Sequence, residues 1–181
     1  PDAQHVATFD AGGARLADDA PAAAGLVHAR LSIIDPRPVA DQPMGNADGS
    51  IWICYNGEVY GWSDAARALA SRGAPFRTHS DTEFILRGYE AWGIEGLLPR
   101  LRGMFAFALV DFRARRVHVV RDRMGLKPVV YAQRDGTFAF GSTVRSVLPS
   151  LAPADREFSA ASIDAYLAHR YVPAPRTIFT H

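Results

Sequence analysis

The sequence contains a single cysteine, Cys54, among its 181 residues. One cysteine cannot build an internal disulfide framework, and it excludes the paired-cysteine sites that bind zinc or carry out redox exchange. The charge is also nearly balanced, because 20 basic residues stand against 19 acidic ones and the net charge is +1. So small a net charge provides no long-range field that would favour a nucleic acid or an anionic membrane as a partner.

Long hydrophobic runs are absent, so we predict no membrane span, and no basic and apolar leader opens the sequence. The six histidines show no H-x-H or H-x-x-x-H spacing, and we therefore predict no metal site. No GxGxxG or GxxxxGK[ST] phosphate loop occurs, so any ATP chemistry would lie outside these residues. The expected protein is soluble and cytoplasmic, with no nucleic-acid or membrane partner.

Hydrophobic alternation and turn residues predict strands, then helices, then strands again. The predicted strands cover residues 25–35, 51–55, 104–110, 117–120, 129–132 and 137–140. The predicted helices cover residues 64–72, 80–92, 94–101 and 160–169. This order favours an α+β fold with antiparallel sheets over alternating βαβ units.

Polar residues mark where these elements begin and end. We expect Ser63 and Ser159 to cap the first and last helices. Ser80 and Glu83 have the spacing of a capping box, and Gly93 is expected to end the helix that they begin. Two pairs, Asn56-Gly57 and Asp135-Gly136, predict turns.

The stretch Tyr55-Asn56-Gly57-Glu58 could carry chemistry. The side-chain amide of Asn56 and the backbone N–H of Gly57 are two neutral donors of the kind that stabilise an oxyanion. A glycine also lets a reacting carbon approach the backbone closely. The alternative is an ordinary Asn-Gly turn, which is the commoner use of this pair.

Three charged residues suggest an amino-acid pocket. Arg30 interrupts an apolar predicted strand, and its guanidinium matches a carboxylate or a phosphate in bidentate fashion. An internal salt bridge or an edge position would explain Arg30 equally well. Asp81 opens a helix, where acids most often serve the helix dipole. In the functional interpretation, Glu58 and Asp81 accept hydrogen bonds from an ammonium while Arg30 binds a carboxylate.

Other reactive or charged residues receive structural interpretations. Cys54 lies inside a hydrophobic predicted strand, which indicates a core residue and not a nucleophile. The run at residues 121–128 alternates charges before a glycine and a proline, so we expect a turn held by ion pairs. The arginines between residues 113 and 116 alone would support a nucleic-acid or partner-binding module, and a solvated hairpin turn is the commoner explanation.

Eight short stretches together carry a resemblance to a known family. They are Pro1-Asp2, HARLSIID (28–35), QPM (42–44), YNGEVY (55–60), FRTHSDTE (76–83), RGMFAFAL (102–109), RDRMGLKP (121–128) and YVPAPRTIF (171–179). Over nearly its whole length the chain resembles the class II glutamine amidotransferase domain of glutamine-dependent asparagine synthetases. This resemblance implies an N-terminal-nucleophile hydrolase fold, with two packed antiparallel β-sheets flanked by helices (αββα).

The resemblance also implies residue roles. Arg30 would bind the α-carboxylate of glutamine, Glu58 and Asp81 would hold its α-ammonium, and Asn56 with Gly57 would form the oxyanion hole. The family's nucleophile is an N-terminal cysteine whose own α-amine acts as the base. Cys54 cannot replace it, so we expect residues 1–181 to be an inactive fragment.

A larger enzyme follows from the same resemblance. It would hydrolyse glutamine to glutamate and ammonia for the ATP-dependent amidation of aspartate. Residues 1–158 would be the glutaminase domain without its first strand and helix. Residues 159–181 would be a linker helix and tail that lead to the C-terminal synthetase domain of the same polypeptide.

The expected ligands and partners are few. Glutamine is the expected substrate, with no metal or cofactor in this domain, and ATP and Mg²⁺ would bind in the absent synthetase domain. A homodimer is a further candidate state. The alternative to an enzyme is a vestigial, non-catalytic scaffold of a β-lactam- or lasso-peptide-synthetase-like protein.

Overall fold

The structure is a computed structural model that describes residues 4–9, 23–31, 34–71, 73 and 75–180. The chain divides into two compact units, residues 1–127 and 128–181. Every pair of neighbouring strands in the described residues is antiparallel, and helices do not alternate with parallel strands. The predicted α+β class is therefore confirmed. The predicted boundary between residues 158 and 159 stays a prediction about the longer polypeptide.

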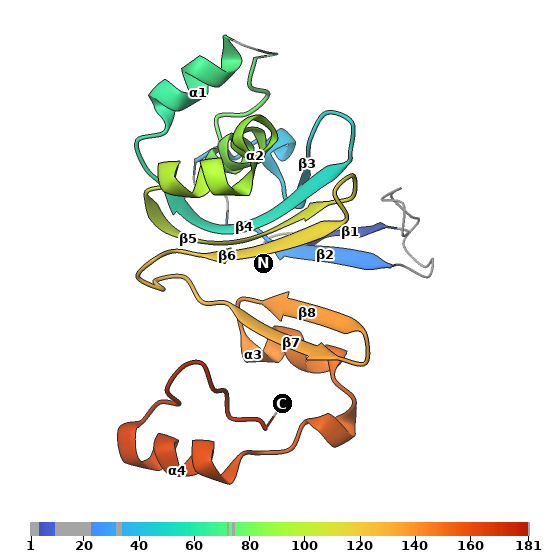
Figure 1. Ribbon diagram of the computed structural model, residues 1–181, viewed down its shortest axis with the longest axis vertical. Coiled ribbons are helices and arrows are strands. Elements are labelled where there is room, and N and C mark those ends of the chain that lie inside the picture. The colour runs from blue at the N-terminus through green and yellow to red at the C-terminus, as the bar shows by residue number, and fades with distance from the viewer. Residues whose placement is uncertain (1–3, 10–22, 32–33, 72, 74, 181) are drawn as a thin grey trace. The chain divides into compact units, whose positions relative to one another are not determined.

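The first unit is built on a four-stranded sheet with the order β3-β4-β5-β6, and a separate β1–β2 hairpin accompanies it (Figure 1). Its longest pairing joins β4 to β5 over nine residues, from Ile51↔Asp111 to Val59↔Gly103. The elements of this unit are β1 (Gln4–Phe9), β2 (Ala24–Ala29), β3 (Met44–Gly45), β4 (Ile51–Val59), α1 (Ser63–Ala70), α2 (Asp81–Leu97), β5 (Gly103–Asp111) and β6 (Arg116–Arg121).

The two faces of this sheet have different neighbours. Ile53 and Tyr55 of β4 point into the core, where they join Phe84 of α2. On the opposite face, the ring of Trp52 lies 5.0 Å from the ring of Phe9 in β1. Figure 1 shows α1 and α2 on one side of the sheet and the β1–β2 hairpin on the other. Both helices of this unit therefore cover one face of its sheet.

The helix α2 begins with a cap that differs in part from the predicted capping box. The Ser80 hydroxyl accepts a hydrogen bond from the Thr82 N–H at 3.0 Å, as expected. The Glu83 carboxylate does not complete the box; it accepts from the backbone N–H and the hydroxyl of Thr78, at 2.7 and 2.8 Å. Glu83 thus fixes the loop before the helix. The helix breaks at Gly93, where φ is +64°, and continues to Leu97.

Three further sequence expectations about the elements of the first unit are wrong. Ser63 is the first residue of α1, and Trp62 occupies the cap position. The strand expected over residues 25–35 ends at Ala29, because the chain then enters a loop in which Asp35 accepts hydrogen bonds from Arg30 and from the His79 N–H. Residues 32–33 lie outside the described residues. The Asn56-Gly57 pair forms no turn, since β4 runs through it to Val59.

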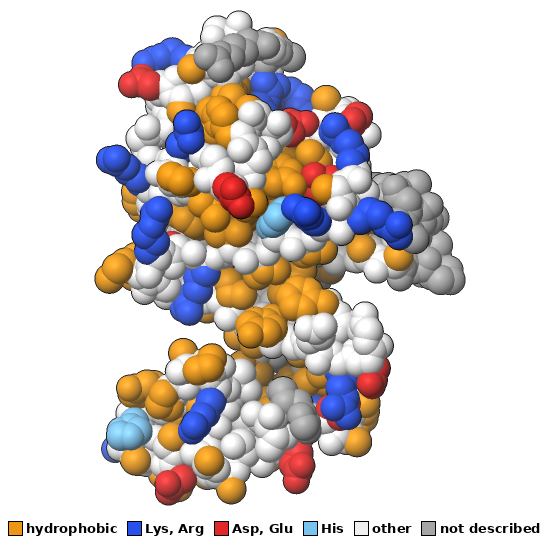
Figure 2. All heavy atoms as spheres, viewed as in Figure 1, with side chains coloured by type: hydrophobic (Ala, Val, Ile, Leu, Met, Phe, Trp, Pro, Cys, Tyr) orange, Lys and Arg blue, Asp and Glu red, His pale blue; other side chains and the backbone are white. Residues whose placement is uncertain are grey.

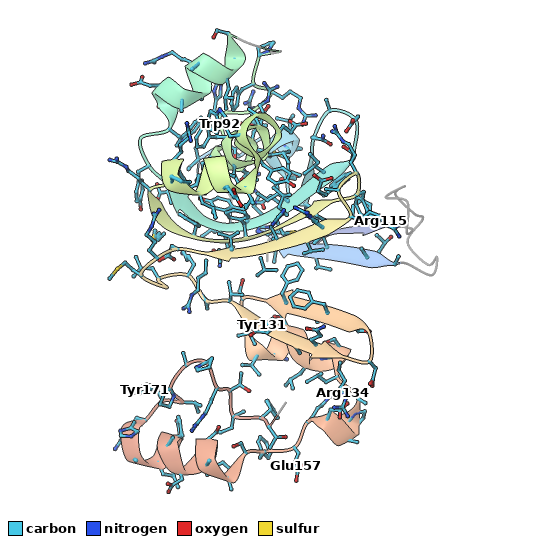
Figure 3. All side chains as sticks on the ribbon, viewed as in Figure 1. Trp92, Arg115, Tyr131, Arg134, Glu157 and Tyr171 are labelled. Carbon is cyan, nitrogen blue, oxygen red and sulfur yellow. The ribbon has the colours of Figure 1, made fainter. Side chains whose placement is uncertain are left out.

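The second unit contains β7 (Val130–Arg134), β8 (Thr137–Gly141), α3 (Val144–Val147) and α4 (Ala160–His169). The β7–β8 hairpin turns at Asp135 and Gly136, whose φ angles of +48° and +77° confirm the predicted tip. Ser159 caps α4 as predicted, with its hydroxyl 3.2 Å from the Ser162 N–H. Arg134, labelled in Figure 3, pairs with Asp155 at 3.1 Å.

The described surface carries both signs of charge. On the face drawn in Figure 2, basic and acidic side chains are interspersed over the first unit. Across the described ranges of the chain, no helix combines the length and the apolar character that a bilayer crossing requires.

Candidate active site

Gly57 lies inside β4, opposite Phe105 of β5. Its φ is +157°, a conformation that favours glycine. A Cβ at this position would collide with the Met104 carbonyl oxygen and would lie 2.6 Å from the Cα of Phe105. Gly57 therefore lets the two strands approach each other closely, and this close approach allows β4 to continue where a turn was expected.

The backbone N–H of Gly57 points away from β5. Tyr60, directly after β4, donates its N–H to the Arg102 carbonyl. In this register the backbone groups of the even-numbered residues of β4 form the hydrogen bonds to β5. Because ladder bonds alternate in an antiparallel pair, the odd-numbered residues direct their N–H groups to the opposite edge. At that edge the Val59 N–H donates to Asp81 Oδ2 at 3.0 Å. The Gly57 N–H is directed to the same edge, two residues earlier.

Asn56 and Glu58 alternate with the core residues of β4. Side chains alternate along a strand, so these two project from the face that does not carry the core. Both are half-buried. The proposed oxyanion donors thus come from adjacent residues, one through a side chain on the sheet face and one through an N–H at the sheet edge.

Asp81 is the first residue of α2, yet it does more than complement the helix dipole. Only 3% of the residue is exposed, and its Oδ2 accepts from the Tyr55 hydroxyl at 2.6 Å as well as from the Val59 N–H. Burial raises the pKa of the Asp81 carboxyl, and these hydrogen bonds oppose the rise. The start of α2 is thereby attached to the edge of β4.

Glu58 contacts a different hydroxyl, that of Tyr60. Its Oε2 lies 3.4 Å from the hydroxyl of Tyr60, which donates to it. Burial raises the pKa of Tyr55 well above its usual range, and the charges of Asp81 and then Glu58 raise it further. Two carboxylates therefore act on one phenol. Asp81 contacts the Tyr55 hydroxyl directly, whereas Glu58 acts on Tyr55 through its charge.

Arg30 follows β2 directly and is 9% exposed. Its Nη1 donates to Asp41 Oδ1 at 2.9 Å, and its Nη2 donates to the Asp35 carbonyl oxygen. The internal salt bridge weighed from the sequence is therefore present. The Asp35 carboxylate in turn accepts from the His79 N–H at 2.8 Å. Arg30 is joined to the segment before Asp81 through Asp35.

Two supporting residues were missed by sequence reasoning. Gln42 accepts from the Tyr55 N–H at 2.6 Å and donates to the Tyr55 carbonyl at 3.1 Å, so it pairs with β4 as a strand would. Asp35 is nearly fully buried, and the guanidinium of Arg37 holds its pKa well below the usual range, with help from the His79 N–H. Both residues lie in the quoted stretches HARLSIID and QPM, which was the available signal.

Cys54 has the properties of a structural thiol. It projects from the same face of β4 as Asn56, with its Sγ 3.9 Å from the Val27 carbonyl oxygen. Burial raises the pKa of the Cys54 thiol to about 12, so it stays protonated near neutral pH. These features agree with the prediction that Cys54 is not a nucleophile.

The charged run at residues 121–128 forms a turn, but ion pairs do not hold it. The Asp122 carboxylate accepts N–H bonds from Met124, Leu126 and Lys127 at 3.0–3.1 Å. The Arg121 guanidinium donates to backbone carbonyls of the same turn. The charges of Arg121 and Asp122 are satisfied by backbone groups, which corrects the sequence interpretation. Among the residues that the structure describes, no group of histidine, cysteine or acidic side chains is arranged to hold a metal ion.

Comparison with known proteins decides the family. The family described as "Glutamine amidotransferase domain" matches residues 10–181. The chain belongs to this family. The domain is also 34% identical over 152 residues to asparagine synthetase (glutamine-hydrolyzing) 1 of Bacillus subtilis, a match that covers 84% of this chain and 23% of the relative. A putative asparagine synthetase (glutamine-hydrolyzing) of Mycobacterium bovis is 38% identical over 156 residues, covering 82% and 24%.

The amidotransferase domain spans about a quarter of the length of these curated relatives. Among solved structures, it is similar to the glutamine phosphoribosylpyrophosphate amidotransferase of B. subtilis complexed with ADP and GMP. The TM-score is 0.63 at 19% identity, over 77% of this chain and 35% of that one. This likeness concerns the fold alone.

Proposed function

We propose that this domain binds glutamine and releases its amide nitrogen as ammonia within an asparagine synthetase-like enzyme. The observation that carries the proposal is the nearly fully buried Asp81 carboxylate, which accepts from the Tyr55 hydroxyl at 2.6 Å while the charge of Glu58 also acts on that phenol. A free amino acid brings an ammonium group, which must be compensated by charge when it leaves water. Two carboxylates, one of them nearly fully buried, supply that compensation.

The other end of the substrate would be held by Arg30. The α-carboxylate of glutamine would bind the Arg30 guanidinium, which forms a salt bridge with Asp41 in this structure. During attack on the side-chain amide, the Asn56 amide and the Gly57 N–H would stabilise the negative charge that forms on the amide oxygen.

The nucleophile in this proposal is a cysteine at the N-terminus of the enzyme, with its own α-amine as the base. Its sulfur would bond to the amide carbon and ammonia would leave; water would then cleave the thioester to give glutamate. The buried thiol of Cys54 is unsuited to this step. We therefore propose that residues 1–181 by themselves release no ammonia.

The ammonia would serve the ATP-dependent amidation of aspartate in a C-terminal synthetase domain of the same polypeptide. The glutaminase step is proposed to use no cofactor, and ATP with Mg²⁺ would bind in the synthetase domain. Similarity to longer, glutamine-hydrolyzing asparagine synthetases supports this arrangement. A homodimer and a cytoplasmic location stay predictions.

The test uses the full-length polypeptide, in which asparagine formation is measured with glutamine or with ammonia as the nitrogen source. We expect Asp81→Asn to raise the KM for glutamine on the order of tenfold to a hundredfold, the cost of weakening a charged contact. Ammonia-driven synthesis should be unchanged, because ammonia bypasses the pocket. The matched control is Asp111→Asn, since Asp111 also accepts from a tyrosine hydroxyl, that of Tyr89, at 2.9 Å.

Equal loss of glutamine-driven and ammonia-driven synthesis in Asp81→Asn would contradict the pocket assignment. An unmodified protein that uses ammonia but never glutamine would support the non-catalytic scaffold instead.

A further inference from the structure

Tyr55 makes a side-chain contact that its position in the sequence did not suggest. Its ring belongs to the hydrophobic core of the first unit, and 5% of the residue is exposed. Its hydroxyl lies beside Asp81 and donates a buried hydrogen bond to Oδ2 at 2.6 Å. The same oxygen accepts from the Val59 N–H. Two donors of β4, one side-chain and one backbone, therefore fix the orientation of the Asp81 carboxylate.

Tyr55 is itself held firmly. Gln42 accepts from its N–H and donates to its carbonyl, and His28 Nε2 lies 3.0 Å from the same carbonyl oxygen. Gln42 Nε2 also lies 3.4 Å from the Thr82 hydroxyl, so it connects the strand to the first turn of α2. A phenol anchored at its backbone and packed around its ring presents its hydroxyl in one place.

This arrangement matters for the charge of Asp81. Burial raises the pKa of the Asp81 carboxyl, whereas the hydrogen bond from Tyr55 favours the ionised form and lowers it. An acid that binds an ammonium has to be ionised. Glu58 and Tyr60 are the other titratable groups that act on Tyr55.

We propose that Tyr55 is a positioning residue for the substrate ammonium, acting through Asp81 by fixing its carboxylate and favouring its ionised form. The proposal rests on the proposed glutaminase function and adds to it a residue whose contact is with the acid and not with the substrate. It differs from a purely structural role, which would affect stability without a selective effect on glutamine.

The test compares Tyr55→Phe with Tyr89→Phe in the full-length polypeptide. Phenylalanine keeps the ring and removes the hydroxyl in both variants, and Tyr89 supplies the matched control because its hydroxyl donates to Asp111 at 2.9 Å. Glutamate release is followed as a function of glutamine concentration between pH 6 and pH 9. Ammonia-driven synthesis is measured in parallel to verify that each variant is folded.

We expect Tyr55→Phe to raise the KM for glutamine on the order of tenfold, with kcat changed less than about twofold. The increase should grow as the pH falls, because loss of the hydrogen bond raises the pKa of Asp81 and protonates it at higher pH. Tyr89→Phe should leave the KM unchanged. In an Asp81→Asn background, Tyr55→Phe should add no further increase, since its partner charge is gone.

Several results would overturn the proposal. One is an unchanged KM in Tyr55→Phe, while the unmodified enzyme hydrolyses glutamine; that result leaves the proposed function intact. Others are a full KM effect of Tyr55→Phe in the Asp81→Asn background, or loss of ammonia-driven synthesis in Tyr55→Phe. No glutamine hydrolysis by the unmodified enzyme would overturn the proposed function and this role together.

Discussion

Arg30 donates to the carboxylate of Asp41 over 2.9 Å, and both residues lie in loops outside the strands. The Arg30 side chain is 10% exposed, whereas the Asp41 side chain is 30% exposed. The residue proposed to bind the substrate carboxylate thus already holds a carboxylate of the protein. A glutamine α-carboxylate would have to share this guanidinium with Asp41 or displace it.

Asp41→Asn should therefore lower the KM for glutamine. The substitution weakens the contact that competes for Arg30, and it removes a negative charge that would repel the substrate carboxylate. We expect a decrease of about threefold to tenfold, in the range of a partly exposed charge interaction. Glutamate release by the full-length protein measures it, and a higher KM in Asp41→Asn would show that Asp41 holds Arg30 in place for the substrate.

Gly57→Ala should destabilise the first unit by about 3 kcal/mol or more, because the new Cβ would force β4 and β5 apart. Gly61→Ala is the control, since Gly61 also has a positive φ, +67°, but no atom lies within 4 Å of its Cβ position. Urea unfolding followed by tryptophan fluorescence reports on this unit, which contains Trp52, Trp62 and Trp92. An equal decrease in the free energy of unfolding in both variants would contradict a role for Gly57 in the close approach of β4 and β5.

Cys54 should resist alkylation in the folded protein. With a thiol pKa of about 12, the reactive thiolate at pH 8 is on the order of one molecule in ten thousand. We expect iodoacetamide to label Cys54 at least about a hundredfold more slowly in the folded chain than in urea. Peptide mass spectrometry quantifies the labelling, and comparable rates in the two states would contradict a buried, protonated thiol.

Asp122 should contribute stability that depends on pH. Hydrogen bonds from the N–H groups of Lys127, Leu126, Phe105 and Met124 lower its pKa in the folded state. The contribution is therefore present above the unfolded pKa of 3.8 and is lost as the pH falls through the lower folded value. Asp122→Asn should unfold at a lower urea concentration than the unmodified chain at pH 7.

The difference between the two proteins should shrink as the pH is lowered toward 3. The control is Asp64→Asn, because the Asp64 side chain is 87% exposed in a surface pair with Arg67 and should change little at either pH. A destabilisation by Asp122→Asn that is the same at pH 7 and pH 3 would show that the charge of Asp122 is not what holds the turn.

Local patterns in the sequence were sufficient for much of the fold. The Asp135-Gly136 tip and the Ser159 cap of α4 were predicted correctly, because each depends on neighbours only a few residues away. The strands β5 to β8 were also predicted to within a few residues. The quoted stretches named the family as well, since they record residue identities in order along the chain.

The tertiary structure decided the features that depend on distant partners. Asn56-Gly57 continues a strand because the backbone of β5 lies where a Cβ of Gly57 would be. Asp81 does more than begin a helix, because the Tyr55 hydroxyl, from 26 positions earlier in the chain, donates to its buried carboxylate. Local propensity describes what a segment can do alone; burial, charge compensation and close approach between strands arise only when the chain has folded.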